Sequence, residues 1–143
     1  MQQNGSTTYT YDGENQLFKV SGSPIWTYNY NSDGQRVIKS NGTVGTRYWV
    51  GADGSNLAES DLAGTLTTEY IFFNGKRIAR RDLPSGTVHY YFSDHLGSTS
   101  VVTDATGNVQ KESDYYPYGG EITVSGSDPN HYKFTCAQTH YWG

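Results

Sequence analysis

Residues 9–17 read Tyr-Thr-Tyr-Asp-Gly-Glu-Asn-Gln-Leu, and this stretch decides the fold. Two tyrosines that are two residues apart project from one face of an extended strand, because side chains alternate across a strand. The Asp-Gly pair that follows predicts a tight reversal, in which the glycine takes a positive φ and the carboxylate binds nearby backbone amides. Leu17 then opens a return strand. The stretch therefore predicts a β-hairpin.

The same pattern recurs along the chain. Residues 28–37 repeat it as Tyr-Asn-Tyr-Asn-Ser-Asp-Gly-Gln-Arg-Val, and looser copies occupy residues 47–57 and 69–79. A repeat of about twenty residues is long enough for one two-stranded unit. We therefore predict an all-β fold in which consecutive antiparallel hairpins form one continuous, twisted, solenoid-like sheet, each unit burying its tyrosines against the next. The predicted strand anchors are Tyr11, Tyr30, Tyr48, Tyr70 and Tyr90, which are separated by 19, 18, 22 and 20 residues.

Three regions follow from this pattern. Residues 1–87 hold the hairpin repeats, and residues 88–121 are expected to form a three-stranded meander. Residues 122–143 are expected to be a loop, with a short strand at 132–135. No segment shows the apolar period of a helix over ten or more residues, so no long helix is expected.

Composition excludes several classes of protein. The apolar material is mostly aromatic, with 13 Tyr, 5 Phe and 3 Trp, which favours strands over helices. A formal charge of −4 offers no basic patch for nucleic acid. No run of about 18 apolar residues could span a bilayer, and the N-terminus does not resemble a signal peptide. Cys136 is the single cysteine, so no intramolecular disulfide can form.

Two further stretches carry a resemblance to a known family. Residues 90–99 read Tyr-Tyr-Phe-Ser-Asp-His-Leu-Gly-Ser-Thr, and residues 115–119 read Tyr-Tyr-Pro-Tyr-Gly. With the preceding repeats, they resemble the Rhs/YD-repeat family and its Rhs-associated core over most of residues 9–135. The resemblance implies similarity to the shells of bacterial polymorphic toxins, insecticidal toxin complex C-components and teneurins, whose repeats wind a sheet into a spiral enclosure. It also implies that residues 88–121 are the core-like meander.

The C-terminal residues depart from the family pattern. Family members usually continue after a segment like 132–135 with Gly-Lys-Glu-Arg-Asp, and later carry an Asp-Pro motif that is associated with self-cleavage. Here Cys136 follows instead, and Asp128-Pro129 lies in a different place and context. No protease role is assigned to Asp128 on this basis.

The candidate site residues are read as structural. Asp94, His95, Leu96 and Gly97 are expected to form a turn, in which Gly97 takes a positive φ, Asp94 accepts backbone amides and Leu96 points into the core. His95 could shuttle protons, but no nucleophile motif accompanies it, and Cys136 matches no catalytic signature. The acidic turns lack the ligand pattern of a calcium loop. We therefore expect no catalytic residue, no metal and no cofactor.

The resemblance implies a non-enzymatic structural protein, either a segment of an Rhs shell or a self-associating fibre or filament at the surface of a bacterium. Its partners would be copies of itself or the rest of the shell, with no nucleic acid and no membrane span. The implied location is secreted or at the cell surface. An alternative is a module that binds carbohydrate or a cell surface through exposed rings. Candidate rings are the pairs Tyr48-Trp49, Tyr90-Tyr91 and Tyr115-Tyr116.

Overall fold

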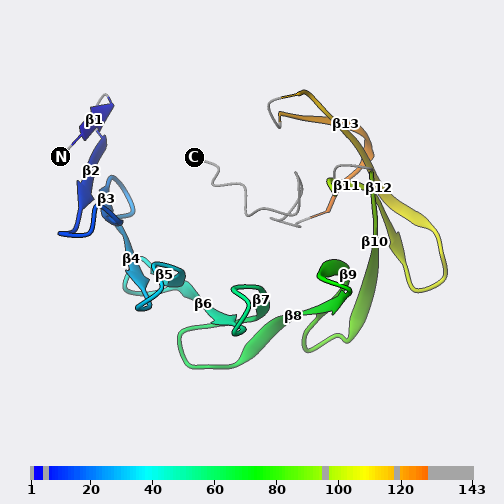
Figure 1. The fold of residues 1–143 in the computed structure, drawn as a ribbon, viewed down its shortest axis with the longest axis horizontal. Helices are drawn as coiled ribbons and strands as arrows, with labels where there is room; N and C mark the ends of the chain where they lie inside the picture. Colours follow the sequence, from blue (N-terminus) through cyan, green and yellow to red (C-terminus); the bar gives the residue numbers. More distant parts are fainter. Residues whose placement is uncertain (1, 5–6, 95–96, 118–119, 129–143) are drawn as a thin grey trace. The chain divides into compact units, whose positions relative to one another are not determined.

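A computed structural model describes residues 2–4, 7–94, 97–117 and 120–128. These residues form thirteen β-strands and no helix, which confirms the predicted all-β class (Figure 1). The strands are β1 (Gln2–Asn4), β2 (Thr7–Tyr11), β3 (Leu17–Ser21), β4 (Trp26–Tyr30), β5 (Arg36–Ser40), β6 (Gly45–Val50), β7 (Asn56–Ser60), β8 (Leu66–Phe73), β9 (Lys76–Asp82), β10 (Thr87–Ser93), β11 (Thr99–Asp104), β12 (Val109–Tyr115) and β13 (Glu121–Gly126).

The sheet keeps the order of the sequence. Each strand lies beside the strands that precede and follow it in the chain, from β1 to β13. The registers that join β1 through β8, and those that join β9 through β13, are antiparallel. The prediction of consecutive antiparallel hairpins in one sheet is therefore confirmed.

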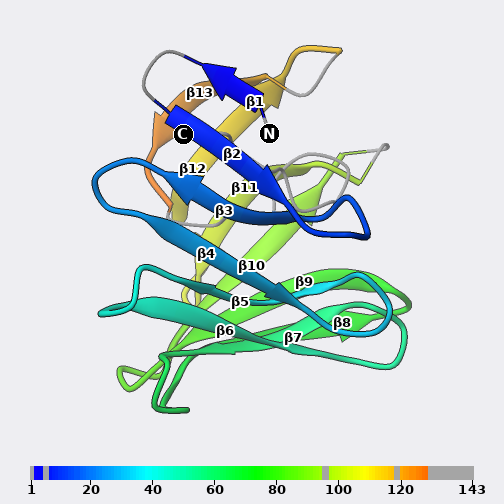
Figure 2. The same ribbon diagram turned by 90° about the vertical axis from the view of Figure 1, so that its left-hand side faces the viewer.

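The chain divides into two compact units, residues 1–69 and residues 70–143. In the first unit, β2 to β7 lie side by side (Figure 2). The boundary falls within β8, whose first residues pair with β7 in the first unit. The division into repeats at 1–87, a core-like meander at 88–121 and a terminal region at 122–143 stays a prediction.

Six hairpin turns in the described residues share one geometry. In each, the first residue donates its amide to the carbonyl four residues later, and its own carbonyl accepts the amide of the residue three positions later. That later residue has a positive φ, and a one-residue register shift precedes every turn. This is a type I turn that closes with a bulge. The turns span 12–16, 31–35, 51–55, 61–65, 94–98 and 104–108.

The prediction for the glycine of the first hairpin was wrong. Gly13 does not have a positive φ; Asn15 does, at 61°. In the second hairpin Gly34 has the positive φ of 74°, but Asn31 and not Asp33 accepts the turn amides. The physical reason is that the left-handed position is the fourth residue of the turn, counted from the residue whose side chain caps it. In five of the six turns the signature is Asp or Asn followed three residues later by Gly or Asn, and an adjacent Asp-Gly pair does not define it. The turn at 51–55 starts at Gly51 instead, and Asp53 accepts the amide of Ser55 there.

The two faces of the second unit both carry buried residues and differ in which aromatic rings of β10 they cover. His89 lies opposite Arg80, and Tyr91 lies opposite Val102, which in turn lies opposite Lys111. These positions share one face, named here the Arg80 face, and Arg80, Tyr91, Val102 and Lys111 are buried on it. On the other face Tyr90 is 44% exposed and Phe92 is 56% exposed.

The tyrosine anchors do not all behave as expected. Tyr70 is buried and Tyr11, Tyr30 and Tyr48 are half-buried. In the last unit, however, the buried ring is that of Tyr91, and Tyr90 lies on the exposed face. Neighbouring residues of a strand face opposite sides, so the register with β11 decides which of the two tyrosines is covered.

The end of the sheet also differs from the sequence prediction. Residues 121–126 form β13, which pairs with β12, where a loop was expected from residue 122. The segment is exposed and not strongly apolar, so its alternation gave a weak signal, and pairing with β12 stabilises it as a strand. The strand expected at 132–135 lies outside the described residues.

Candidate functional site

Buried charged side chains gather on the Arg80 face of the second unit. Arg80 comes from β9, and its side chain is only 4% exposed. Its Nε lies 2.7 Å from Oδ1 of Asp82, and its terminal NH2 donates to Oδ2 of Asp82 at 3.1 Å. Because Arg80 and Asp82 are two residues apart on a strand, they face the same side and can pair. His89, opposite Arg80, brings its Nε2 to 3.3 Å from Oδ2 of Asp82.

Asp128 reaches the same arginine from beyond the last described strand. Its Oδ1 lies 3.0 Å from the terminal NH2 of Arg80, and its side chain is 2% exposed. Within the described part of the chain, neither carboxylate oxygen of Asp128 accepts a hydrogen bond in addition to this ion pair. Arg80 thus holds one carboxylate from its own strand and a second from a distant segment.

Tyr91 completes this cluster. Burial raises the pKa of its phenol well above the ordinary value, Arg80 opposes that shift, and Asp128 adds to it. Its hydroxyl makes no hydrogen bond with the described residues. Burial alone would lower the pKa of Arg80, but Tyr91 and the carboxylates of Asp128 and Asp82 raise it overall. The arginine therefore stays charged, and the tyrosine stays neutral at physiological pH.

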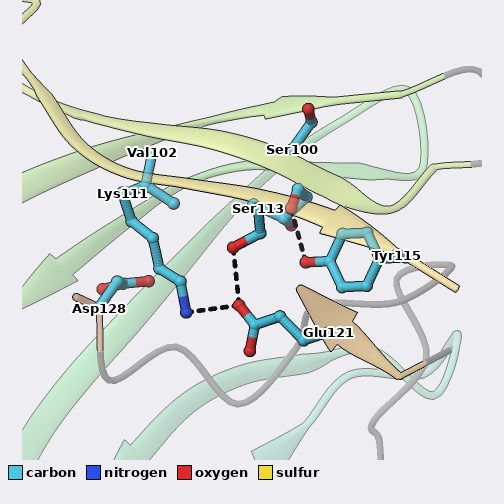
Figure 3. Close-up of a pocket in the computed structure, with 8 residues that line it drawn as sticks. Ser100, Val102, Lys111, Ser113, Tyr115, Glu121 and Asp128 are labelled. Atoms are coloured by element: carbon cyan, nitrogen blue, oxygen red, sulfur yellow. Dashed lines mark hydrogen bonds and ion pairs between the residues drawn. The ribbon is translucent and has the colours of Figure 1, made fainter. Parts of the chain in front are cut away.

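A second buried network lies on β12 and β13 (Figure 3). The ammonium of Lys111 pairs with Oε1 of Glu121, and the Ser113 hydroxyl donates to the same oxygen at 2.7 Å. The Lys111 and Glu121 side chains are 8% and 13% exposed. Together with Tyr115 and Asp128 they line a small hollow of about 180 Å³, part of which is open to solvent.

Tyrosine hydroxyls also bind the backbone across the sheet. Tyr115 donates to the carbonyl of Thr99 at 2.7 Å, and Tyr30 donates to the carbonyl of Leu17 at 2.9 Å. In both cases the tyrosine is the last residue of its strand, and the acceptor is the first residue of the preceding strand. The two units thus repeat one interaction.

Cations stack on rings in both units. In the first unit the guanidinium of Arg36 lies 5.6 Å from the ring centre of Tyr28 and 5.1 Å from that of Tyr48. Burial raises the pKa of Tyr48, with Arg36 opposing the shift. In the second unit Arg77 lies 4.7 Å from the ring centre of Tyr70. Such contacts fix the rings against the sheet and add modestly to stability.

The sequence-predicted turn has the geometry common to the six hairpin turns. Gly97 has a φ of 88°, and Oδ1 of Asp94 accepts the amide of Ser98 at 2.8 Å. His95 and Leu96 lie outside the described residues. The role assigned to the four residues as a structural turn stays a prediction.

Sequence reasoning missed the Arg80 cluster. None of Arg80, Asp82, His89 and Lys111 was singled out, since each looks like an ordinary solvated charge of an exposed strand. A usable signal was the placement of charged residues at the buried positions of predicted strands. Among the described residues, no group of three His, Cys, Asp or Glu side chains is arranged to hold a metal ion. Cys136, His131 and His140 lie outside the described residues.

Comparison with known proteins gives the context for this arrangement. No family model matches the chain. Over 139 residues, covering 91% of the chain, it is 28% identical to the tRNA nuclease WapA of Bacillus subtilis strain 168 and 27% identical to the tRNA3(Ser)-specific nuclease WapA of Bacillus spizizenii. The match spans only 6% of each of these relatives.

Solved structures show the same fold. The crystal structure of TcdB2-TccC3 matches 94% of the chain with a TM-score of 0.63 at 13% identity, and the chain covers 8% of it. A Tc holotoxin pore of Photorhabdus luminescens matches 82% of the chain with a TM-score of 0.56 at 15% identity, and the chain covers 7% of it. The chain has an Rhs-like fold. In the described residues no helix is long and apolar enough to cross a membrane.

The comparisons correct the functional prediction. The sequence predicts a non-enzymatic structural protein, with a module that binds carbohydrate or a cell surface as the alternative. The curated relatives are instead named tRNA nucleases, so the prediction that no enzyme is involved was wrong. The error has a physical origin, since a repeat pattern reports the fold and carries no information on the reaction that the whole polypeptide performs.

Proposed function

We propose that this chain is a section of a tRNA-cleaving toxin of the Rhs/YD-repeat kind, and that residues 88–121 are its Rhs-associated core segment. The observation that carries the proposal is the alignment of 139 residues with nucleases that are named for tRNA. The likeness of the fold to toxin-complex structures supports it independently.

Within such a toxin, we propose that this sheet forms part of the wall around the nuclease polypeptide. Arg80 and Lys111, two buried cations of the second unit, are already paired with carboxylates and shielded from solvent. A cation in such a pair is not available to a phosphate of tRNA. The partners of this section would then be the rest of the shell, and the toxin would act after secretion.

The test is cleavage of tRNA by the natural gene product that contains residues 1–143. The purified product is incubated with total tRNA, with ribosomal RNA and with double-stranded DNA, and the products are separated on denaturing gels. We expect discrete tRNA fragments and intact DNA. A mock preparation, purified in the same way from cells that lack the gene, controls for contaminating nuclease. Intact tRNA after prolonged incubation would contradict the proposal.

The proposed role as a wall leads to a separate prediction about the affinity of this section for tRNA. The section carries a formal charge of −4, so we expect the isolated 143-residue chain to show no affinity for tRNA at physiological salt. Filter binding with labelled tRNA measures this. Retention of tRNA by the chain would instead assign substrate binding to this sheet and would overturn the wall role.

A further inference from the structure

The chain leaves the sheet of the second unit at a place that is built from three residues. Gly126 ends β13 with a φ of 69°. A Cβ at this position would overlap the carbonyl oxygen of Gln110 and lie 3.1 Å from the Cα of Lys111. Only glycine meets both requirements, because other residues resist the positive φ and have no room beside the backbone of β12.

The next charged residue after this glycine is Asp128, which is buried. Moving a carboxylate from water into the protein costs several kcal/mol unless an opposite charge compensates it. The compensating charge is Arg80 on β9, at 3.0 Å. The two residues are 48 positions apart, and no strand pairing brings them together. The contact is therefore a tertiary contact, and it forms beyond the last strand of the sheet.

Arg80 is able to hold the Asp128 carboxylate because its other carboxylate partner, Asp82, is shared with His89. Asp82 pairs with Arg80 but also lies 3.3 Å from Nε2 of His89, and its side chain is 33% exposed. The guanidinium presents a planar fork of donors and can pair with two carboxylates at once. Lys111, which lines the same hollow as Asp128, is occupied by Glu121. In Figure 3 the carboxylate of Asp128 lies beside the Lys111 side chain at the edge of this network.

We propose that Gly126, Asp128 and Arg80 form an exit point that directs the chain out of the sheet across the Arg80 face. Gly126 turns the backbone at the end of β13, and the Arg80 guanidinium fixes the Asp128 carboxylate on that face. The chain therefore reaches Asp128 on the Arg80 face and not on the face that carries Tyr90 and Phe92. The exit point is independent of the nuclease activity proposed above.

Hydrogen exchange on the full 143-residue chain tests the exit point. In Asp128→Asn the side chain keeps its shape and loses its charge, so we expect amide exchange in a peptide covering residues 121–128 to accelerate by about tenfold, with the exchange of β9 to β12 unchanged. Asp128→Glu keeps the charge and is expected to restore part of the protection. Asp114→Asn, an exposed aspartate of the same unit, is the matched control and should leave exchange unchanged.

Arg80 gives the reciprocal test. Arg80→Lys keeps a charge but loses the fork that holds two carboxylates, and we expect it to accelerate exchange of the same peptide while the chain stays folded by circular dichroism. Combining it with Asp128→Asn should not accelerate the exchange of this peptide further, because both changes remove the same contact between Arg80 and Asp128. Wild-type exchange of residues 121–128 in Asp128→Asn, or fully additive effects in the double variant, would overturn the proposal.

Discussion

The Tyr115 hydroxyl donates a hydrogen bond of 2.7 Å to the carbonyl oxygen of Thr99, and so fixes the end of one strand to the start of the strand before it. The Tyr30 hydroxyl does the same to Leu17 in the other unit. In each case a side chain binds a backbone group that lies outside the local turn. The tyrosine that ends each of these two strands therefore contributes a polar contact as well as a ring.

Removing either hydroxyl should cost stability. We expect Tyr30→Phe and Tyr115→Phe each to lower the free energy of unfolding by about 1 kcal/mol, because each removes one hydrogen bond between neighbouring strands. Urea unfolding followed by tyrosine and tryptophan fluorescence measures the change. Tyr116→Phe is the control, since that ring is 60% exposed, and it should change the midpoint little. Equal effects at Tyr115 and Tyr116 would contradict this interpretation.

The turn geometry predicts which glycines can be replaced. Gly64 has a φ of 95° and Gly97 a φ of 88°, so Gly64→Ala and Gly97→Ala should each destabilise the chain by about 1 kcal/mol through backbone strain. Gly13→Ala should be close to neutral, since Gly13 has no positive φ and an added Cβ would meet no atom within 4 Å. Thermal unfolding of the three variants provides the comparison. A larger loss at Gly13 than at Gly64 would refute the assignment of the left-handed position.

At Asn15 the opposite substitution, to glycine, can be tested. It is a residue other than glycine with a φ of 61°, so Asn15→Gly removes a small strain and should be neutral or slightly stabilising, by a few tenths of a kcal/mol. Asn15→Ala should destabilise, because alanine tolerates this conformation less well than asparagine does. Differential scanning calorimetry can resolve the order of the three melting temperatures. The expectation fails if the alanine variant melts highest.

The capping aspartates predict an acid-dependent stability. Hydrogen bonds from Thr106 and Asn108 lower the pKa of Asp104, and those from Thr65 lower the pKa of Asp61. The unfolded chain therefore binds more protons than the folded one at low pH, and stability rises with pH. The contribution of these turns is complete above the unfolded value of about 4 and is lost as the pH falls below it.

This pH dependence can be measured with Asp104→Asn. The amide oxygen can still accept the backbone amides of Thr106 and Asn108, although the bonds to the second carboxylate oxygen are lost. Because the amide cannot titrate, the unfolding midpoint in urea should fall less steeply between about pH 5 and pH 2 than in the wild type. Asp114→Asn again serves as a control at an exposed position. Parallel pH profiles for wild type and Asp104→Asn would show that the turn carboxylate does not contribute.

The buried pair of Lys111 and Glu121 predicts that losing the carboxylate lowers stability strongly, and that removing the ammonium as well compensates part of this loss. Glu121→Gln leaves the ammonium buried without a carboxylate partner, and we expect it to cost about 3 kcal/mol. The double variant with Lys111→Met also removes that buried charge and should recover part of the loss. Urea midpoints for the two single variants and the double variant form the cycle. A double variant that is less stable than Glu121→Gln would contradict this expectation.

Residues 9–17 and their copies were enough to predict the hairpins and their order. The reason is that a hairpin turn is local: the residue that caps it and the residue with the positive φ are three positions apart, as Asp104 and Gly107 show. The sequence alone also indicated the fold that the solved toxin-complex structures share. It did not indicate a reaction, because the repeats describe a sheet and not a site.

Only the tertiary structure decided which side chains are buried and which charges meet. Tyr90 and Tyr91 are adjacent in the sequence, and the register of β10 with β11 covers one and exposes the other. A register shift of one residue precedes each of the six turns, so strict alternation of faces does not continue from one strand into the next. Asp128 and Arg80 are brought together by the path of the chain after β13, where no periodic pattern remains, and the energy of a buried ion pair depends on that path.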